Sequence, residues 1–166
     1  MFLVKLIRIL LCVLWLLAAS LAFAAEFRGL VVGIADGDTI TVLDSDRKQH
    51  KIRLAGIDAP ENRQPFGERS KQHLSTLAFR KTASLDCFKT DQYKRQVCRV
   101  RVDGVDVGLA QVAAGLAWHY KRFEKDQTEI ERTAYSRAED DARASRLGLW
   151  NDKQPVPPWE FRRHTK

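Results

Sequence analysis

Cysteine is scarce in this chain, and long polar or repetitive stretches are missing. Three of the 166 residues are cysteines, which is too few for a small scaffold built on disulfides. Hydrophobic residues make up 45% and charged residues 30%, a balance that excludes long disorder and fibrous repeats. No internal repeat is present in the sequence. Length and composition therefore indicate one globular domain.

Acidic residues are outnumbered by basic ones. Lys and Arg number 28 against 21 Asp and Glu, which gives a net charge of +7 at pH 7. A basic balance favours a polyanionic partner, such as nucleic acid or a membrane surface, but it does not determine the fold.

Residues 1–24 predict an export signal ahead of the domain. Lys5 and Arg8 precede an apolar run, and Ala22 and Ala24 match the A-x-A pattern of signal peptidase sites. We expect cleavage near Ala24. The alternative is an uncleaved anchor, but the apolar run is at the short end for a bilayer span. The sequence therefore predicts an exported protein, periplasmic or secreted, without stable membrane association after cleavage.

Export changes the interpretation of Cys87 and Cys98, the two cysteines beyond the leader. Each stands in an alternating apolar and polar pattern, which predicts that both lie on apolar faces of neighbouring strands. In an oxidising compartment they can form a disulfide, and this pairing is favoured over two buried free thiols. A metal site at these two cysteines is disfavoured because no histidine or further cysteine is near them in the sequence.

The order of expected elements predicts a small barrel. Strands are expected at residues 27–35, 39–43 and 49–57, a helix at 67–80, and a hairpin at 83–88 and 96–102. Five short strands with an inserted helix predict a mainly β (α+β) fold, a five-stranded Greek-key barrel of the OB type with three helices. The domain is expected over residues 25–151, followed by an extended, proline-containing tail over 152–166.

Two helices are expected after the hairpin. Asp106 can cap a helix that ends near Ala114. Residues 128–131 (Thr-Glu-Ile-Glu) form a capping box at the start of another helix. One helical stripe on that helix is expected to comprise Ile130, Ala134, Ala138 and Ala142.

Acidic residues gather in two short segments, Asp36-Gly-Asp38 and Asp58-Ala-Pro-Glu61. One segment follows the first strand and the other follows the third, so a barrel can bring them together. Packed carboxylates raise each other's pKa, and a hard divalent cation such as Ca²⁺ or Mg²⁺ relieves that cost. Both segments are also plausible turns. The acids alone therefore leave a metal site and two ordinary turns equally open.

Two arginines add a second signal. Arg53 lies on the strand that runs into Asp58, and Arg95 lies beyond the hairpin turn. A guanidinium matches a phosphate in shape and stays charged at any working pH. With a metal, two such groups would make a site for phosphoryl transfer. A single arginine in so basic a chain is more often a solvated surface charge.

Five motifs, in order along the chain, resemble those of the staphylococcal-nuclease (thermonuclease) family. They are Ala35-Asp-Gly-Asp-Thr39, Arg53-Leu-Ala-Gly-Ile-Asp-Ala-Pro-Glu61, Asp91-Gln-Tyr-Lys-Arg95, Gly115-Leu-Ala-Trp118 and Gly148-Leu-Trp150. The resemblance spans residues 27–150, nearly all of the expected mature chain.

The resemblance implies an OB barrel and a Ca²⁺-dependent phosphodiesterase that uses one divalent ion. DNA and RNA would be cut at the 5′ P–O bond to leave 3′-phosphorylated products. By the same resemblance, Asp38, Asp58 and the backbone carbonyl of Ala59 would bind the metal, with Asp36 in the outer coordination shell. Glu61 would be the general base or would orient the attacking water.

The remaining implied contacts are to the nucleotide. Arg53 and Arg95 match the two arginines that clamp the phosphate, and Tyr93 matches a tyrosine near the terminal phosphate. The base-stacking tyrosines of the family do not map cleanly here, so Tyr120 and Phe123 are candidates only.

Departures from the family pattern are also present. Gln92 stands where a lysine is expected near the phosphate. Trp118 is interpreted as a core residue rather than as a platform for a base.

Two other classes of function compete with a monomeric nuclease. An OB barrel can bind nucleic acid without cutting it, but an inactive module would be expected to lack one or more residues of the catalytic set, and all are present. That set comprises Asp38, Arg53, Asp58, Glu61 and Arg95. A surface protein that binds polyanions by charge alone ranks third, because its charge does not explain the clustered acids.

Overall fold

The strands of this chain close into a barrel. The structure, a computed structural model, describes residues 27–164, so the expected export signal lies outside the described residues. Within residues 27–164 no helix has both the length and the apolar character needed to cross a membrane.

Five strands form the barrel, and the order around it is β3-β2-β1-β5-β6. These strands are β1 (Phe27–Ile34), β2 (Thr39–Leu43), β3 (Gln49–Leu54), β5 (Thr82–Thr90) and β6 (Gln96–Val102). Neighbouring strands are antiparallel, except that β3 and β6 pair in parallel and so close the barrel, with Leu54 opposite Cys98. The predicted α+β fold with a five-stranded OB-type barrel is confirmed.

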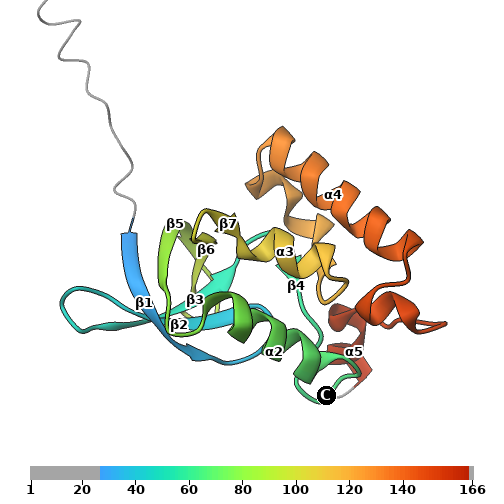
Figure 1. Ribbon diagram of the computed structural model, residues 1–166, viewed down its shortest axis with the longest axis horizontal. Coiled ribbons are helices and arrows are strands. Elements are labelled where there is room, and N and C mark those ends of the chain that lie inside the picture. The colour runs from blue at the N-terminus through green and yellow to red at the C-terminus, as the bar shows by residue number, and fades with distance from the viewer. Residues whose placement is uncertain (1–26, 165–166) are drawn as a thin grey trace, which may run out of the picture.

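Short strands and helices surround the barrel. The short strands are β4 (Ile57–Asp58), which pairs with β8 (Trp118–His119), and β7 (Val105–Asp106), which pairs with β6. The α-helices are α2 (Gly67–Ala78), α3 (Val107–Ala113), α4 (Glu129–Ala144) and α5 (Pro158–His164), and the 3₁₀ helices are η1 (Lys121–Asp126) and η2 (Gly148–Asn151). Figure 1 shows α3 between the barrel and α4, while α5 lies at the same end of the molecule as α2.

Local signals explain where two helices begin. The Asp106 side chain accepts a hydrogen bond from the Leu109 amide at the start of α3. Thr128 and Glu131 form the predicted capping box, with both reciprocal bonds present. Such caps supply partners for amides that a helix end leaves unbonded.

The expected stripe on α4 is wrong at its first residue. Ile130 is 83% exposed, while Tyr135 and Ala142 are buried on the core side of the helix. With 3.6 residues per turn, residues four apart drift around the axis, so Ile130 and Ala142 point about 120° apart. The buried face therefore follows the seven-residue spacing of Tyr135 and Ala142.

The tail also differs from its expected form. An extended segment was expected over the last residues, but Pro158–His164 form α5. Proline suits the first turn of a helix because its missing amide proton would have had no intrahelical partner.

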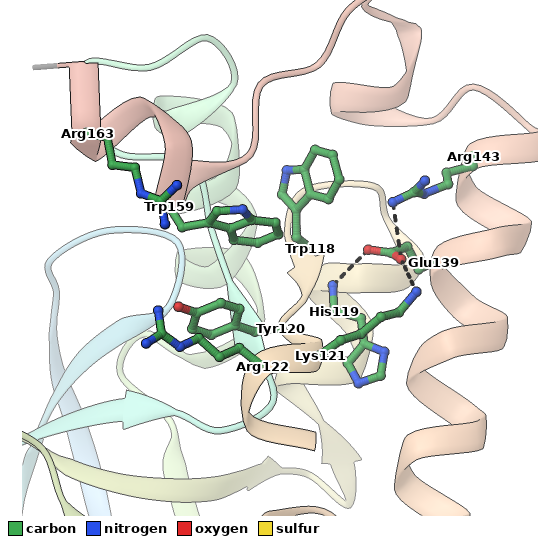
Figure 2. Close-up of a pocket in the computed structure, with 9 residues that line it drawn as sticks. All are labelled: Trp118, His119, Tyr120, Lys121, Arg122, Glu139, Arg143, Trp159 and Arg163. Atoms are coloured by element: carbon green, nitrogen blue, oxygen red, sulfur yellow. Dashed lines mark hydrogen bonds and ion pairs between the residues drawn. The ribbon is translucent and has the colours of Figure 1, made fainter. Parts of the chain in front are cut away.

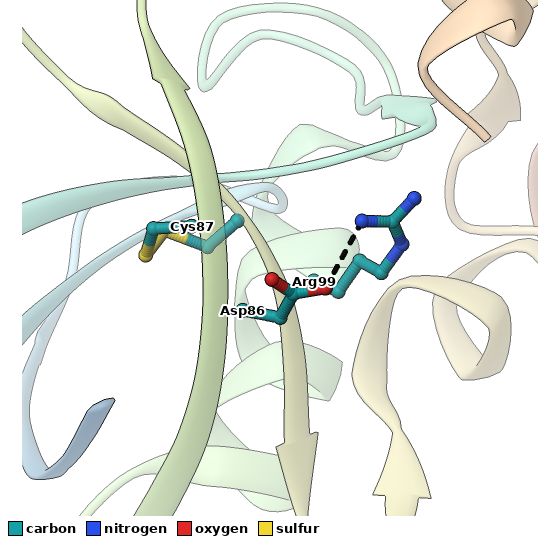
Figure 3. Close-up of a disulfide and its surroundings, with 4 residues drawn as sticks. Asp86, Cys87 and Arg99 are labelled. Carbon is teal, nitrogen blue, oxygen red and sulfur yellow. Dashed lines mark hydrogen bonds and ion pairs between the residues drawn. A yellow bond between two sulfur atoms is a disulfide. The ribbon is translucent and has the colours of Figure 1, made fainter. Parts of the chain in front are cut away.

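Cys87 and Cys98 face each other across β5 and β6 and form a disulfide (Figure 3). Cys98 is fully buried in the barrel core, whereas Cys87 is exposed on the outer part of β5. Cys87 therefore lies on the same side of the sheet as the buried Leu85 and Cys98, as expected, but the strand is exposed at this position. Beside the disulfide, Arg99 pairs with Asp86 across the same two strands, at 3.1 Å, and with Glu131 of α4, at 2.6 Å.

We expect Cys87→Ser combined with Cys98→Ala to lower the free energy of unfolding by roughly 2–3 kcal/mol, because the bridge restricts the unfolded hairpin. Urea denaturation of the oxidised protein and of this variant measures the difference. Reduction of the wild-type protein should reproduce the loss. An unchanged urea midpoint under both treatments would contradict the prediction.

Candidate active site

The barrel brings the two acidic segments together around Arg53. One guanidinium nitrogen of Arg53, Nη2, lies 3.2 Å from Asp38 Oδ2 and 3.0 Å from Asp58 Oδ1. The other nitrogen, Nη1, donates to the carbonyls of Leu54 and Ile57. Asp38 and Asp58 are 6% and 1% exposed. Buried charges of this kind persist only when they are paired, so this ion-pair cluster is a fixed part of the fold.

Asp38 connects the segments through its own hydrogen bonds. Its Oδ2 accepts from the Ala59 amide at 2.8 Å, and its Oδ1 accepts from the Thr39 hydroxyl at 3.0 Å. Its backbone carbonyl accepts from the Leu54 amide. The strands β2 and β3 therefore position this carboxylate from both sides.

Asp36 lies beside this pair, with its Oδ1 accepting from the Asp38 amide at 3.0 Å. Burial and, next, the negative charge of Asp38 raise the pKa of Asp36 to about 6. Burial also raises the pKa of Asp58, against the opposing effects of Arg162 and Arg53. The cluster therefore favours added positive charge, which is the electrostatic property of a cation site.

The donor set fits a hard divalent cation in kind. Asp38, Asp58 and the carbonyl of Ala59 offer oxygen atoms, the ligands that Ca²⁺ and Mg²⁺ prefer. Over residues 27–164, however, no three His, Cys, Asp or Glu side chains are grouped closely enough to hold a metal ion by themselves. Any bound cation would therefore need backbone or water oxygens in addition.

Arg95 reaches the cluster from the start of β6. Its Nε lies 2.7 Å from Asp91 Oδ2, and its Nη1 donates to the Thr39 hydroxyl at 3.2 Å. Because Thr39 in turn donates to Asp38, Arg95 lies one side chain away from the acids. Tyr93 is 69% exposed, and its ring lies 5.3 Å from the Arg95 guanidinium.

Glu61 is the accessible acid of the site, with 39% of its side chain exposed. Its backbone amide donates to Gln64 Oε1, and its Oε1 accepts from Arg162 Nη1 at 2.7 Å. Arg162 comes from α5, and sequence reasoning missed it entirely. It is 104 residues from Asp58, which it also contacts, and no local pattern could signal such a pairing.

Gln111 is a second residue that the sequence did not reveal. Its fully buried side-chain amide donates to the carbonyls of Gly37 and Ser70, at 2.7 and 3.0 Å. Gly37 packs so tightly that a Cβ there would lie 1.8 Å from the Ser70 hydroxyl. The turn that carries Asp36 and Asp38 is thereby held against α2.

A pocket of about 410 Å³ lies beside β8, the strand partner of β4, and Trp118 on its wall stands opposite Asp58 in the register of the two strands. Its lining combines aromatic, cationic and acidic side chains (Figure 2): Trp118, His119, Tyr120, Lys121, Arg122, Glu139, Arg143, Trp159 and Arg163. Trp118 packs on Trp150, as expected of a core residue, but it also lines this pocket.

The two aromatic candidates contact each other, but of the two only Tyr120 lines the pocket. Tyr120 lines the pocket and stacks on Trp159, with ring centroids 5.3 Å apart and an interplanar angle of 13°. Phe123 contacts the Tyr120 ring by its edge, but it is not part of the pocket wall and lies under Lys89 instead.

Asp36→Asn is expected to stabilise the metal-free protein at pH 7.5 by about 1–2 kcal/mol, and to have little effect near pH 4. The raised pKa means that the folded state binds the proton more tightly, so stability falls as the pH rises from about 4 to 6 and the carboxylate forms. Asparagine keeps the acceptor for the Asp38 amide. Urea denaturation with chelator at both pH values tests this, with exposed Asp46→Asn as the control for lost charge. Equal effects at the two pH values would contradict it.

The chain that carries this site is similar to known proteins. A family model described as "Staphylococcal nuclease homologue" matches residues 51–152. That range includes Arg53, Asp58, Glu61 and Arg95, which the structure places at or beside the acid cluster.

Curated relatives extend the similarity over most of the chain. An "Uncharacterized endonuclease" of Haemophilus influenzae is 40% identical over 136 residues, 82% of this chain and 73% of the relative. "Protein ParB" of Escherichia coli is 42% identical over 159 residues, 90% of this chain and 86% of the relative. A "Micrococcal nuclease" of Shigella flexneri is 38% identical over 159 residues, 90% and 88% of the two chains. The resemblance seen in the sequence is confirmed, and the chain belongs to the staphylococcal nuclease family.

Proposed function

We propose that this protein is an exported, Ca²⁺-dependent nuclease that hydrolyses DNA and RNA at the 5′ P–O bond and leaves 3′-phosphorylated ends. Family membership and the names of the relatives support hydrolysis of nucleic acids in general. The observation that carries the proposal is the cluster of Asp38, Arg53 and Asp58, with Glu61 accessible at its edge.

Asp38, Asp58 and the Ala59 carbonyl would hold one divalent ion, with Asp36 in the outer coordination shell. The support is chemical: all of these groups offer oxygen, and the pKa of Asp36 is raised to about 6 by burial and by its charged neighbour. When bound, the ion would offset the crowded negative charge and polarise a phosphate oxygen.

The side chains of the chain would carry the remaining chemistry. Arg53 and Arg95 would bind the anionic phosphate oxygens and stabilise the charge that develops on them in the transition state. Each such donor would raise kcat on the order of 10²–10³-fold. Glu61 would accept a proton from the attacking water, which would raise the rate of hydrolysis by roughly 10²–10⁴-fold. Its partial exposure suits this role, because water must reach it.

Nucleic acid would be held beside the acids by the side chains that residues 118–122 contribute to the pocket wall. Tyr120 offers a ring face on which a base can stack, and Lys121 and Arg122 lie on the same pocket wall. Tyr93 would contact a terminal phosphate from its exposed position beside Arg95. Because such binding releases counterions, affinity should fall steeply with added salt.

The export proposal has independent support from the hairpin. A disulfide joins Cys87 and Cys98, and disulfides persist in oxidising compartments such as the periplasm or the extracellular space.

A catalytically inactive module that binds nucleic acid is the alternative function.

We expect the mature protein, beginning at Ala25, to digest single- and double-stranded DNA and RNA with Ca²⁺ and to be inactive with chelator. Glu61→Gln should reduce kcat by about 10²–10⁴-fold, because it removes the proton acceptor. Glu129→Gln, a comparable change at an exposed position on α4, is the matched control. Release of phosphate from the product ends by a 3′-phosphatase identifies the bond that is cut.

Binding to DNA without cleavage under Ca²⁺ or Mg²⁺ would reject the nuclease and favour the inactive module. Cleavage that persists in Glu61→Gln would retain a nuclease but reject the assigned role of this residue.

A further inference from the structure

The helix α5 contacts two carboxylates of the proposed active site, those of Asp58 and Glu61. Arg162 Nη2 is 2.7 Å from Asp58 Oδ2, and Arg162 Nη1 is 3.2 Å from Asp58 Oδ1 and 2.7 Å from Glu61 Oε1. Both oxygens of Asp58 are thus engaged by one guanidinium, and Oδ1 also contacts Arg53. The Arg162 side chain places positive charge where a divalent cation would need to bind.

A second residue of α5 lies on the candidate base platform. Trp159 stacks on Tyr120 almost in parallel, at 13°, and meets the Trp118 ring edge-on at 5.6 Å (Figure 2). Parallel stacking on an aromatic side chain is how single-stranded nucleic acids are commonly bound. Trp159 therefore covers one face of the Tyr120 ring and takes the place that a stacked base would occupy there.

Contacts of both α5 and the segment before it attach the helix to the domain. Pro158 is buried, and the Gln64 side chain donates to the Val156 carbonyl at 2.6 Å. The helix has seven residues, too few to be stable without tertiary contacts. The contacts of Arg162 and Trp159 contribute to its docking, so any ligand that replaces them favours its release.

We infer that α5 is an autoinhibitory plug, in which Arg162 competes with the divalent cation for Asp58 and Glu61 while Trp159 competes with a nucleic-acid base for Tyr120. The inference rests on the proposed nuclease function. In the docked state Arg162 engages both oxygens of Asp58 and one oxygen of Glu61, so the cation that the proposed reaction needs is kept out and this state is inactive. Cation and substrate together displace α5 and open the site.

The competition predicts a measurable effect on the cation alone. Only the undocked fraction binds the cation, so the apparent affinity is reduced by that fraction. Removing the guanidinium of Arg162 should restore the intrinsic affinity. Arg163 is the matched control, because it lies on the same short helix and contributes the same charge, but it lies on the pocket wall, where Figure 2 shows it beside Trp159.

The experiment measures Ca²⁺ binding to the full mature chain by calorimetry, without nucleic acid. Arg162→Gln should bind Ca²⁺ about tenfold more tightly than wild type, the size expected if about a tenth of the wild-type molecules are undocked. Arg163→Gln should remain within about twofold of wild type. Unchanged or weaker Ca²⁺ binding in Arg162→Gln would overturn the inference.

Two further readouts separate a plug from a permanent wall of the site. Hydrogen exchange at the amides of residues 159–164 should accelerate in wild type when Ca²⁺ and single-stranded DNA are added. Trp159→Ala should lower KM for single-stranded DNA with little change in kcat. Slower exchange, or a raised KM in Trp159→Ala, would show that α5 is part of the substrate site and overturn the inference.

Failure of the inference can be distinguished from failure of the proposed function. If wild type and Arg162→Gln bind Ca²⁺ equally and both digest DNA, the plug is rejected and the nuclease stands. If neither protein binds Ca²⁺ or digests DNA, both proposals are rejected. Activity in Arg162→Gln with an inactive wild type would support both.

Discussion

The guanidinium of Arg53 lies between the carboxylates of Asp38 and Asp58, and this buried contact joins segments from three strands. Each carboxylate would be costly to bury alone, and so would the guanidinium, but the opposite charges together offset this cost. Two further bonds from Arg53 to the carbonyls of Leu54 and Ile57 fix the chain where it turns from β3 into β4. The positions of the other site residues depend on this arrangement, because Asp38 also holds the Ala59 amide and the Thr39 hydroxyl.

The same cluster leaves an excess of negative charge at its outer edge. Burial and the charge of Asp38 raise the pKa of Asp36 to about 6, and Glu61 adds a further carboxylate. In the structure this edge is covered by Arg162 of α5, so the protein itself supplies a cation to the acids. The charge balance that suits a metal ion is therefore the one that attracts an intramolecular arginine, and this coupling connects the proposed catalysis with its proposed regulation.

Much of the fold could be predicted from local patterns. Alternating apolar residues indicated the barrel strands, and Asp106 and Thr128 marked the starts of α3 and α4. The predictions that failed were those in which local pattern and packing differ. Ile130 continues an apolar spacing but faces solvent, and Cys87 lies on the expected side of β5 but is exposed there. In both cases a repeat in the sequence does not determine which neighbour covers that position.

The sequence by itself determined the family, the barrel strands, the starts of α3 and α4, and the residue types of the candidate site, because each is encoded in residues close together in the chain. The tertiary structure alone decided which side chains meet. Gln111 supports the turn at Gly37, Trp159 stacks on Tyr120, and Arg162 pairs with Asp58 across 104 residues of sequence. These contacts depend on closure of the barrel and on where the last helix docks. No periodicity or motif records them, because the free energy that selects them comes from surfaces that exist only after folding.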